Sequence, residues 1–404
     1  MPSIFRMAAL AAAFPALVFA QAKPAGPPPM SVTTAAGQVR IEKLASLEFP
    51  WAVAALPDGR LLITEKPGRL RIFANGTLSE PVTGVPRTSY RERKQEQGGL
   101  LDVAVDPNFA QNHRIFLSFS EPAEKQSPDQ KETDDPRFGG GLDLSDNLLV
   151  GGAVASATLE GNALSNLTVI WRQAPKEIGR GHFGNVMLVA KDGTIFITSG
   201  DRMRFDPAQD TNANLGKVVH INADGSAAKD NPYAGAKGGR DDLWSIGHRN
   251  MLAIAQRSNG QVWVVEMGPL GGDELNLIKK GANYGWPIVS DGDNYDKSPI
   301  PDHKTRPEFE AAVKTWTPVI APAGALFYDG GMFPWRGDLI VGGLASQAII
   351  RVTLDGDKFK SEERLNMGRR IRDVMQAADG AIIAITDDKQ GELLRLSPEK
   401  GKTR

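Results

Sequence analysis

GRLLITE, residues 59–65, is a short apolar strand pattern that begins at the turn dipeptide Asp58-Gly59. An Asp-Gly or Asn-Gly pair suits the positive-φ turn of a β-hairpin, and the aliphatic run behind it predicts a buried strand. The same pattern recurs five more times along the chain. The further copies are NHRIFLSFS (112–120), GTIFITSG (193–200), GQVWVVEM (260–267), GDLIVGGL (337–344) and GAIIAITD (380–387).

The spacing of these copies predicts the fold. They lie about 64 residues apart on average, which fits a four-stranded propeller blade with a core repeat of roughly 40–50 residues and a variable loop. We therefore predict an all-β fold, a six-bladed β-propeller of four-stranded antiparallel blades, over residues 39–404. A β-sandwich or two stacked barrels would have no reason to repeat one strand six times, whereas a closed ring leaves no open sheet edge.

The composition excludes several classes of protein. The 404 residues include 43 Gly and 27 Pro, as expected of many short strands joined by turns, and no Cys. Without cysteine there is no disulfide, thiol nucleophile or Cys-ligated metal. The net charge of −1 provides no positive field for a nucleic-acid backbone, so we expect no nucleic-acid partner.

The N-terminus has the features of a secretory signal peptide over residues 1–20. Arg6 precedes an apolar run of about 13 residues, and Val18 and Ala20 are suitable small residues before a cleavage point. The alternative, a membrane anchor, needs roughly 20 apolar residues. We expect cleavage, no stable membrane insertion, a Pro-rich linker over residues 21–38, and a periplasmic or secreted mature protein.

The repeat strands also predict where a ligand binds. If the strands are equivalent, the polar or small residues at their ends gather at one mouth of the central channel. We expect the long stretch 121–165 to be a loop insertion at this mouth. The residues at the strand ends are Glu65, Ser120, Asp201, Glu266 and Asp387.

Two of the five histidines lie in unusual polar segments. His182 belongs to the loop GRGHFGN (179–185), whose glycines allow the backbone to approach a ligand closely. His248 belongs to the cluster SIGHRN (245–250), just before a repeat strand. We expect the others to be non-catalytic: His113 and His220 as structural residues and His303 as a solvated surface residue.

Two further stretches carry charge in a suggestive pattern. EMGPLGGDELNLIKKGANYGWP (266–287) combines carboxylates with a Gly-Pro turn, which suits a hard cation such as Ca²⁺ or, alternatively, a capped surface loop. In GRRIRDV (368–374), Arg370 and Arg372 alternate along one strand and point the same way. Two adjacent guanidiniums suit bidentate capture of a polycarboxylate, although a solvated charged strand gives the same pattern.

Several motifs in fixed order resemble one family, the soluble pyrroloquinoline quinone (PQQ)-dependent aldose sugar dehydrogenases, or glucose/sorbosone dehydrogenases. The resemblance runs from about residue 40 to 397, and the family fold is a six-bladed propeller. The motifs are EQGGLLDVAVDPNF (96–109), GHFGN (181–185), ITSGD (197–201), LGKVVHINADGS (215–226), IGHRN (246–250), GPLGGDELNLIKKGANYGWP (268–287), IAPAGALFY (320–328) and RRIRDV (369–374).

The resemblance implies oxidation of an aldose at C1 to its lactone, with the hydride passed to PQQ. His182 matches the general base and Asp201 its supporting aspartate. Matching positions assign cofactor contacts to Gln97, Arg249, Asn250, Arg370 and Arg372. The matching calcium ligands are the Gly268 and Pro269 carbonyls beside the cofactor and Glu274 with the Tyr284 carbonyl at a second, structural ion.

The sequence departs from the family at several positions near the implied cofactor. Met251, Leu252 and Ala253 replace a common Pro-Gln-Gly, and Met267 replaces His or Gln. A thioether cannot donate a hydrogen bond. Leu270 stands where arginine is common, and Ala345 lies where some members carry a lysine against the quinone.

We expect an exported sugar dehydrogenase with PQQ and Ca²⁺ as cofactors, a sugar substrate, and a quinone or cytochrome as electron acceptor. The oligomeric state stays open. Two alternatives from other classes are a Ca²⁺-dependent propeller lactonase and a binding propeller without activity or cofactor. The clustered arginines favour an anionic organic cofactor over the lactonase.

Overall fold

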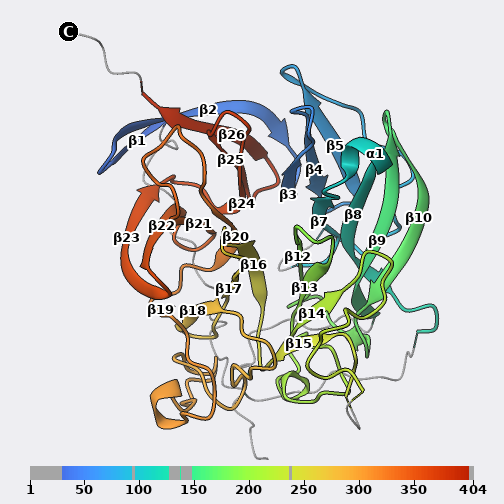
Figure 1. The fold of residues 1–404 in the computed structure, drawn as a ribbon, viewed down its shortest axis with the longest axis vertical. Helices are drawn as coiled ribbons and strands as arrows, with labels where there is room; N and C mark the ends of the chain where they lie inside the picture. Colours follow the sequence, from blue (N-terminus) through green and yellow to red (C-terminus); the bar gives the residue numbers. More distant parts are fainter. Residues whose placement is uncertain (1–29, 93–95, 127–136, 138–147, 236–238, 400–404) are drawn as a thin grey trace, which may run out of the picture.

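The computed structural model describes residues 30–92, 96–126, 137, 148–235 and 239–399. The predicted signal peptide and residues 21–29 of the predicted linker lie outside these ranges. Six antiparallel sheets are arranged in a ring (Figure 1). This confirms the predicted all-β, six-bladed propeller.

The first strand of each blade lies near the centre of the ring (Figure 1). Each of these strands contacts the first strand of the next blade, and the last contacts the first, so the ring is closed. The six inner strands are β3 (Pro50–Ala55), β7 (Leu100–Val105), β12 (Gly184–Val189), β16 (Met251–Gln256), β20 (Pro322–Phe327) and β24 (Ile371–Gln376).

The second strand of each blade is the one that the sequence repeat predicts. Most of its residues are buried because neighbouring blades pack on both faces, which explains why the repeat is continuously apolar rather than alternating. The second strands are β4 (Leu61–Glu65), β8 (Arg114–Pro122), β13 (Ile195–Ser199), β17 (Val262–Glu266), β21 (Leu339–Gly343) and β25 (Ile382–Thr386).

The third and fourth strands complete the blades toward the rim. The third strands are β5 (Arg69–Ala74), β9 (Leu149–Glu160), β14 (Lys217–Ile221), β18 (Asp273–Leu277), β22 (Ala348–Asp355) and β26 (Gly391–Pro398). The fourth strands are β6 (Thr77–Leu78), β10 (Ala163–Arg172), β15 (Leu243–Ile246), β19 (Lys314–Trp316), β23 (Lys358–Asn366) and β2 (Gly37–Leu47).

The two ends of the described chain meet in the last blade. β2 pairs with the C-terminal strand β26 along most of its length, and β1 (Ser31–Thr34) pairs with β2 as a fifth strand. The predicted linker boundary at residue 38 is therefore wrong, because residues 31–38 already belong to the sheet. N-terminal pairing of this kind ties the first and last parts of the chain together and closes the ring.

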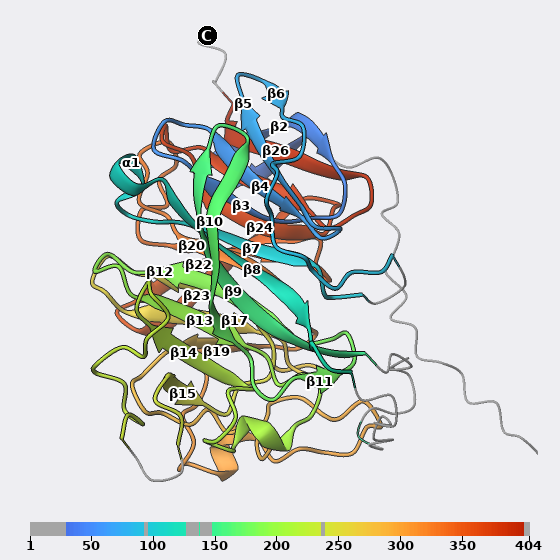
Figure 2. The same cartoon turned by 90° about the vertical axis from the view of Figure 1, so that its right-hand side faces the viewer.

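The second blade also has an added strand. β11 (Glu177–Ile178) pairs with β9, whose hairpin with β10 faces the viewer in Figure 2. The predicted loop insertion over 121–165 is only partly correct, since residues 149–165 lie in this hairpin. Residues 127–136 and 138–147 of the stretch are outside the described ranges.

Hydroxyl groups on the second strands connect neighbouring blades. Thr64 of β4 donates to the Leu101 carbonyl of β7 over 2.5 Å, and Ser118 of β8 donates to the Asn185 carbonyl of β12 over 2.6 Å. Such bonds satisfy buried polar groups at the blade interfaces and fix the inner strands in place. Helix is confined to α1 (Phe109–Asn112) and two 3₁₀ turns among the described residues, where no helix is long and apolar enough to cross a membrane.

Candidate active site

The two residues matched to a base and its supporting aspartate, His182 and Asp201, form a buried pair. His182 precedes β12 and Asp201 follows β13, so adjacent strands of one blade bring them together. The imidazole Nδ1 lies 2.7 Å from Asp201 Oδ1, and the two side chains are 7% and 1% exposed. The Asp201 carboxylate also accepts hydrogen bonds from the Met203 amide (2.9 Å) and from the Trp286 indole (2.8 Å).

Glycine is required where the two loops of this pair cross. A Cβ on Gly200 would lie 2.1 Å from the His182 carbonyl oxygen, and one on Gly181 would lie 2.6 Å from the sulfur of Met203. His182 itself has φ 50°, a left-handed conformation that a histidine adopts only when its surroundings impose it. The loop is therefore held in a set shape that the sequence motif GRGHFGN already suggested.

Arg202 supplies much of that restraint. Its buried guanidinium donates to the carbonyls of Gly181, Gly179 and Val150, and it stacks on the Phe183 ring at 4.0 Å. These bonds tie the His182 loop to β9. Sequence reasoning missed this residue because an arginine in a turn gives no sign of being buried.

The electrostatics leave His182 neutral and Asp201 ionised. Burial, and after it the nearby Arg249 guanidinium, lowers the pKa of His182. Burial acts to raise the pKa of Asp201, but His182, Arg249 and the Met203 amide outweigh it, so the Asp201 pKa is lowered. An ionised Asp201 accepts the Nδ1 proton and leaves the Nε2 lone pair as the basic site.

The predicted cofactor residues Gln97, Arg249 and Asn250 lie around this pair. Gln97 Oε1 accepts from the His182 amide at 2.9 Å, and the Arg249 carbonyl accepts from the Asp201 amide at 2.8 Å. Arg249 Nε and Asn250 Oδ1 are buried without a hydrogen-bond partner. Buried polar atoms of this kind are costly unless a ligand completes them, so these residues fit a polar organic ligand.

Arg370 and Arg372 share one carboxylate. Arg370 donates to Asp387 Oδ2 through Nε (2.9 Å) and Nη2 (2.6 Å), and Arg372 donates to Oδ1 through Nε (3.1 Å) and Nη2 (2.7 Å). Burial alone would raise the Asp387 pKa, but Arg372 and Arg370 hold it far below its usual range. One charge of the arginine pair remains uncompensated by Asp387, which fits an anionic ligand.

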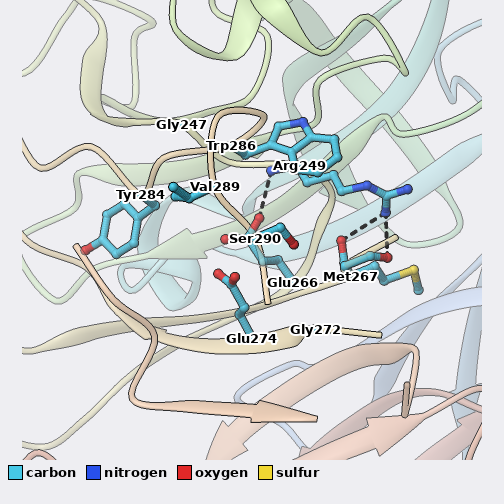
Figure 3. Close-up of a pocket in the computed structure, with 11 residues that line it drawn as sticks. Gly247, Arg249, Glu266, Met267, Gly272, Glu274, Tyr284, Trp286, Val289 and Ser290 are labelled. Atoms are coloured by element: carbon cyan, nitrogen blue, oxygen red, sulfur yellow. Dashed lines mark hydrogen bonds between the residues drawn. The ribbon is translucent and has the colours of Figure 1, made fainter. Parts of the chain in front are cut away.

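A small pocket lies beside Arg249 (Figure 3). It measures about 10 Å³, room for one water-sized occupant, and the carboxylates of Glu266 and Glu274 both border it. Glu266 accepts three hydrogen bonds, from His248 (2.9 Å), Asn276 (2.9 Å) and the Arg249 amide (2.7 Å). Burial and then the Glu266 charge raise the pKa of Glu274 to about 8.

The predicted calcium ligands are only partly disposed to bind a metal. The Gly268 carbonyl accepts from Arg249 Nη1 at 2.8 Å, and the Tyr284 carbonyl lies 3.0 Å from His303 Nε2. Glu274 Oε2 accepts from Asn276 Nδ2 at 3.0 Å, and Glu274 Oε1 lies 3.9 Å from His303 Nδ1. No group of three or more His, Asp or Glu side chains that could hold a metal is found in the described part of the chain.

His303 corrects one sequence prediction. It is 6% exposed rather than solvated, because its 3₁₀ turn (His303–Thr305) packs over the Tyr284 carbonyl. His113 ends α1 just before β8 rather than lying in the strand. His220 lies in β14 and stacks on Phe196 at 4.1 Å, a structural position as expected.

The departures from the family pattern have clear positions. The Met267 sulfur accepts a hydrogen bond from Asn250 Nδ2 at 3.8 Å. The thioether therefore binds the amide of a predicted cofactor residue and offers no donor to a ligand. The Leu270 amide donates to the Asp293 carbonyl. Ala345 is exposed and follows Leu344, whose carbonyl lies 3.4 Å from Arg370 Nη1. No cationic side chain therefore comes from position 345.

The fold is thus a six-bladed propeller that contains a buried His–Asp pair close to the Arg249 guanidinium. The sequence model of the family described as Glucose / Sorbosone dehydrogenase matches residues 47–395 of this chain. The chain belongs to this family of sugar dehydrogenases.

Individual relatives agree with that membership. The aldose sugar dehydrogenase YliI of Escherichia coli (strain K12) is 36% identical over 372 residues, 89% of this chain and 93% of the relative. The quinoprotein glucose dehydrogenase B of Acinetobacter calcoaceticus is 26% identical over 445 residues, 87% of this chain and 85% of the relative. A crystal structure of a glucose dehydrogenase superposes with a TM-score of 0.78 at 40% identity, covering 88% of this chain and 98% of that one.

Proposed function

We propose that this protein is an exported quinoprotein that oxidises aldose sugars at C1 to lactones, with His182 as the general base. PQQ, when bound, would supply the acceptor for the hydride that leaves C1. The observation that carries the proposal is the buried His182–Asp201 pair, whose imidazole is held neutral through its lowered pKa, together with the unpartnered Arg249 Nε and Asn250 Oδ1. Family membership supports sugar as the substrate class.

The chain's own residues account for the proton. As hydride leaves C1, the anomeric hydroxyl must lose its proton, and His182 Nε2 takes it. Asp201 fixes the tautomer through Nδ1 and stabilises the imidazolium that forms. Arg249 and Asn250 would hold the cofactor on one side, and Arg370 and Arg372 would bind its carboxylates.

We also propose that Ca²⁺ takes part in cofactor binding. Support comes from Glu274, a buried carboxylate whose Oε1 lies 3.9 Å from His303 Nδ1, and from the Gly268 carbonyl beside Arg249. The Pro269 carbonyl is included because its position matches the family's calcium ligand. Arg249 occupies the Gly268 carbonyl, so a cation there would have to share that oxygen or displace the guanidinium. Calcium dependence of PQQ binding, measured with and without a chelator, tests this part.

Export rests on the sequence pattern of residues 1–20, and N-terminal sequencing of the mature protein tests it. The electron acceptor is proposed to be a quinone or a cytochrome.

Reconstitution tests the main proposal. Purified protein is mixed with PQQ and Ca²⁺, given a panel of aldoses and an artificial electron acceptor, and the lactone product is identified. We expect turnover with at least one aldose, and a loss of roughly 10²–10⁴-fold for His182→Ala with PQQ binding retained. No quinone absorbance after reconstitution and no turnover with any aldose would contradict it. Hydrolysis of added lactones without quinone would indicate a lactonase instead.

A further inference from the structure

Lys66 occupies an unusual place for a turn lysine. It directly follows Glu65, the last residue of β4, and its backbone is fixed on both sides: its amide donates to the Phe49 carbonyl (2.9 Å), and its carbonyl accepts from Leu100 (3.0 Å). A Cβ on Gly99 would lie 2.3 Å from the Lys66 carbonyl oxygen. The chain therefore holds this turn tightly between β4 and the start of β7.

The Lys66 ammonium is poorly satisfied. Its single hydrogen bond within the described ranges is a long one, 3.5 Å, to the Glu96 carbonyl, and the Phe49 ring centroid lies 5.3 Å away. An ammonium has three protons to donate. Burial lowers the Lys66 pKa, and Arg372 and Arg370 act in the same direction, against Asp387 and Glu96.

This ammonium lies between the two halves of the candidate site. On one side, Glu96 precedes Gln97, which accepts from the His182 amide. On the other side, the Phe49 carbonyl accepts from the Lys66 amide (2.9 Å) and the Phe49 amide donates to the Asp388 carbonyl (3.1 Å), so Lys66 is linked through one residue to the neighbour of Asp387, which binds both arginines. All four N–H bonds to Asp387 come from the arginines, so that carboxylate does not satisfy Lys66.

We propose that Lys66 is a third cation of the anion-binding site and donates to a carboxylate or carbonyl oxygen of the anionic ligand held by Arg370 and Arg372. The two arginines share one carboxylate and Lys66 has none, so the three cations leave net positive charge, and the ammonium has protons without acceptors. A bound polycarboxylate would supply both the acceptor and the negative charge that these groups lack. The inference rests on the proposed function, because PQQ is the polycarboxylate considered.

The test measures binding to the apo-protein by calorimetry, with two probes: PQQ, and benzene-1,3,5-tricarboxylate as a carboxylate ligand without quinone chemistry. Lys66→Met keeps the length of the side chain and removes its charge. We expect it to weaken both probes by about 10- to 100-fold, the equivalent of one charge-assisted hydrogen bond. Lys66→Arg should retain most of the affinity, and Lys360→Met, on the exposed face of β23, should retain all of it.

Thermal unfolding of the apo-protein separates binding from structure. If Lys66 serves the ligand, Lys66→Met should leave the apo-protein at least as stable as wild type, because burial and two guanidiniums already disfavour the ammonium. A clear loss of apo stability would overturn the proposal and assign Lys66 to the fold.

The two probes separate the inference from the proposed function. Equal PQQ affinity in wild type and Lys66→Met overturns the inference and leaves the quinoprotein function intact. Lys66-dependent binding of the tricarboxylate without PQQ binding supports the inference and overturns the function. Binding of neither probe by wild type overturns both.

Discussion

Trp286 is expected to tune the base through Asp201. Its indole Nε1 donates to Asp201 Oδ2 at 2.8 Å, and its ring stacks on Phe205 with centroids 5.4 Å apart. Trp286→Phe would remove this N–H while keeping an aromatic ring between Phe205 and Arg249. The substitution therefore isolates one hydrogen bond to the carboxylate that orients His182.

The size of the effect follows from the bonds that remain. Asp201 would still accept from His182 and the Met203 amide. A hydrogen bond to a buried charged group contributes about 1.5–3 kcal/mol, and one pKa unit corresponds to about 1.4 kcal/mol. A less satisfied carboxylate attracts the imidazolium more strongly, so the His182 pKa, now lowered by burial and Arg249, should rise by about one unit.

The measurement is the pH profile of kcat/KM between pH 5 and 9.5 for the reconstituted enzyme. The base acts only when neutral, so the acid limb of the Trp286→Phe profile should move up by about one unit, with larger losses at pH 6 than at pH 9. Trp263→Phe is the matched control, because the Trp263 indole N–H is buried in β17 without a partner. Its profile should follow wild type.

Two outcomes would refute the reasoning. An acid limb that does not move, with a uniform drop in kcat, would show that Trp286 acts only through packing. A limb that moves to lower pH would show that the indole bond does not restrain the charge of Asp201.

Three further changes have defined outcomes. Gly200→Ala puts a methyl group 2.1 Å from the His182 carbonyl oxygen. We expect kcat/KM to fall at least tenfold and the melting temperature to drop. Wild-type turnover would contradict the close approach of the Gly200 and His182 backbones. Asp387→Asn leaves two guanidiniums without their carboxylate, so unfolding in urea at pH 7 should show a loss on the order of 3 kcal/mol. Because the folded pKa of Asp387 is depressed, this stability is present above about pH 4, and the difference should shrink as the pH falls below that value. Burial raises the pKa of Asp373 to about 7, so the free energy of unfolding of the wild type should decrease as the pH rises from about 4 to 7. Asp373→Asn should reduce the difference in this free energy between pH 5 and pH 8, measured by urea unfolding. An unchanged difference would show that another group is responsible.

Much of the fold could be predicted because the decisive signal is local. A strand such as β4 is buried on both faces, and its hairpin turn lies next to it in the sequence, so seven residues carry the pattern. The closing strand β2 gave no such signal. Its partner β26 is more than 340 residues away, and a polar strand on the rim resembles a linker.

The same limit applies within the site. His182 was recognisable from its glycine-rich loop, whereas His303 was not, because its burial depends on a carbonyl 19 residues earlier in the chain. Lys66 stands in a Lys-Pro-Gly turn that by itself suggests solvent exposure. Its proposed role depends on Arg370 and Arg372 of the sixth blade, which closure of the ring places beside the first blade.

The repeat explains why the site could form from separate parts of the chain. The residue at or just after the end of a second strand bonds the segment that enters the first strand of its own blade, and four blades place a carboxylate there. The pairs are Glu65 with the Glu48 amide, Asp201 with His182, Glu266 with His248, and Asp387 with Arg370.

One backbone position thus serves at least three purposes, according to the group that the carboxylate binds. Asp201, which binds the His182 imidazole, would orient the proposed base. Glu266 binds the buried His248 imidazole, which lies between Ser245 and Tyr284, and so stabilises the core. Facing a guanidinium, Asp387 holds a cation ready for an anion. The chemistry therefore resides in the residue just before each inner strand, because the carboxylate is supplied by the repeat. Substitution at that entering position should change what a blade binds, whereas substitution of the carboxylate should first cost stability.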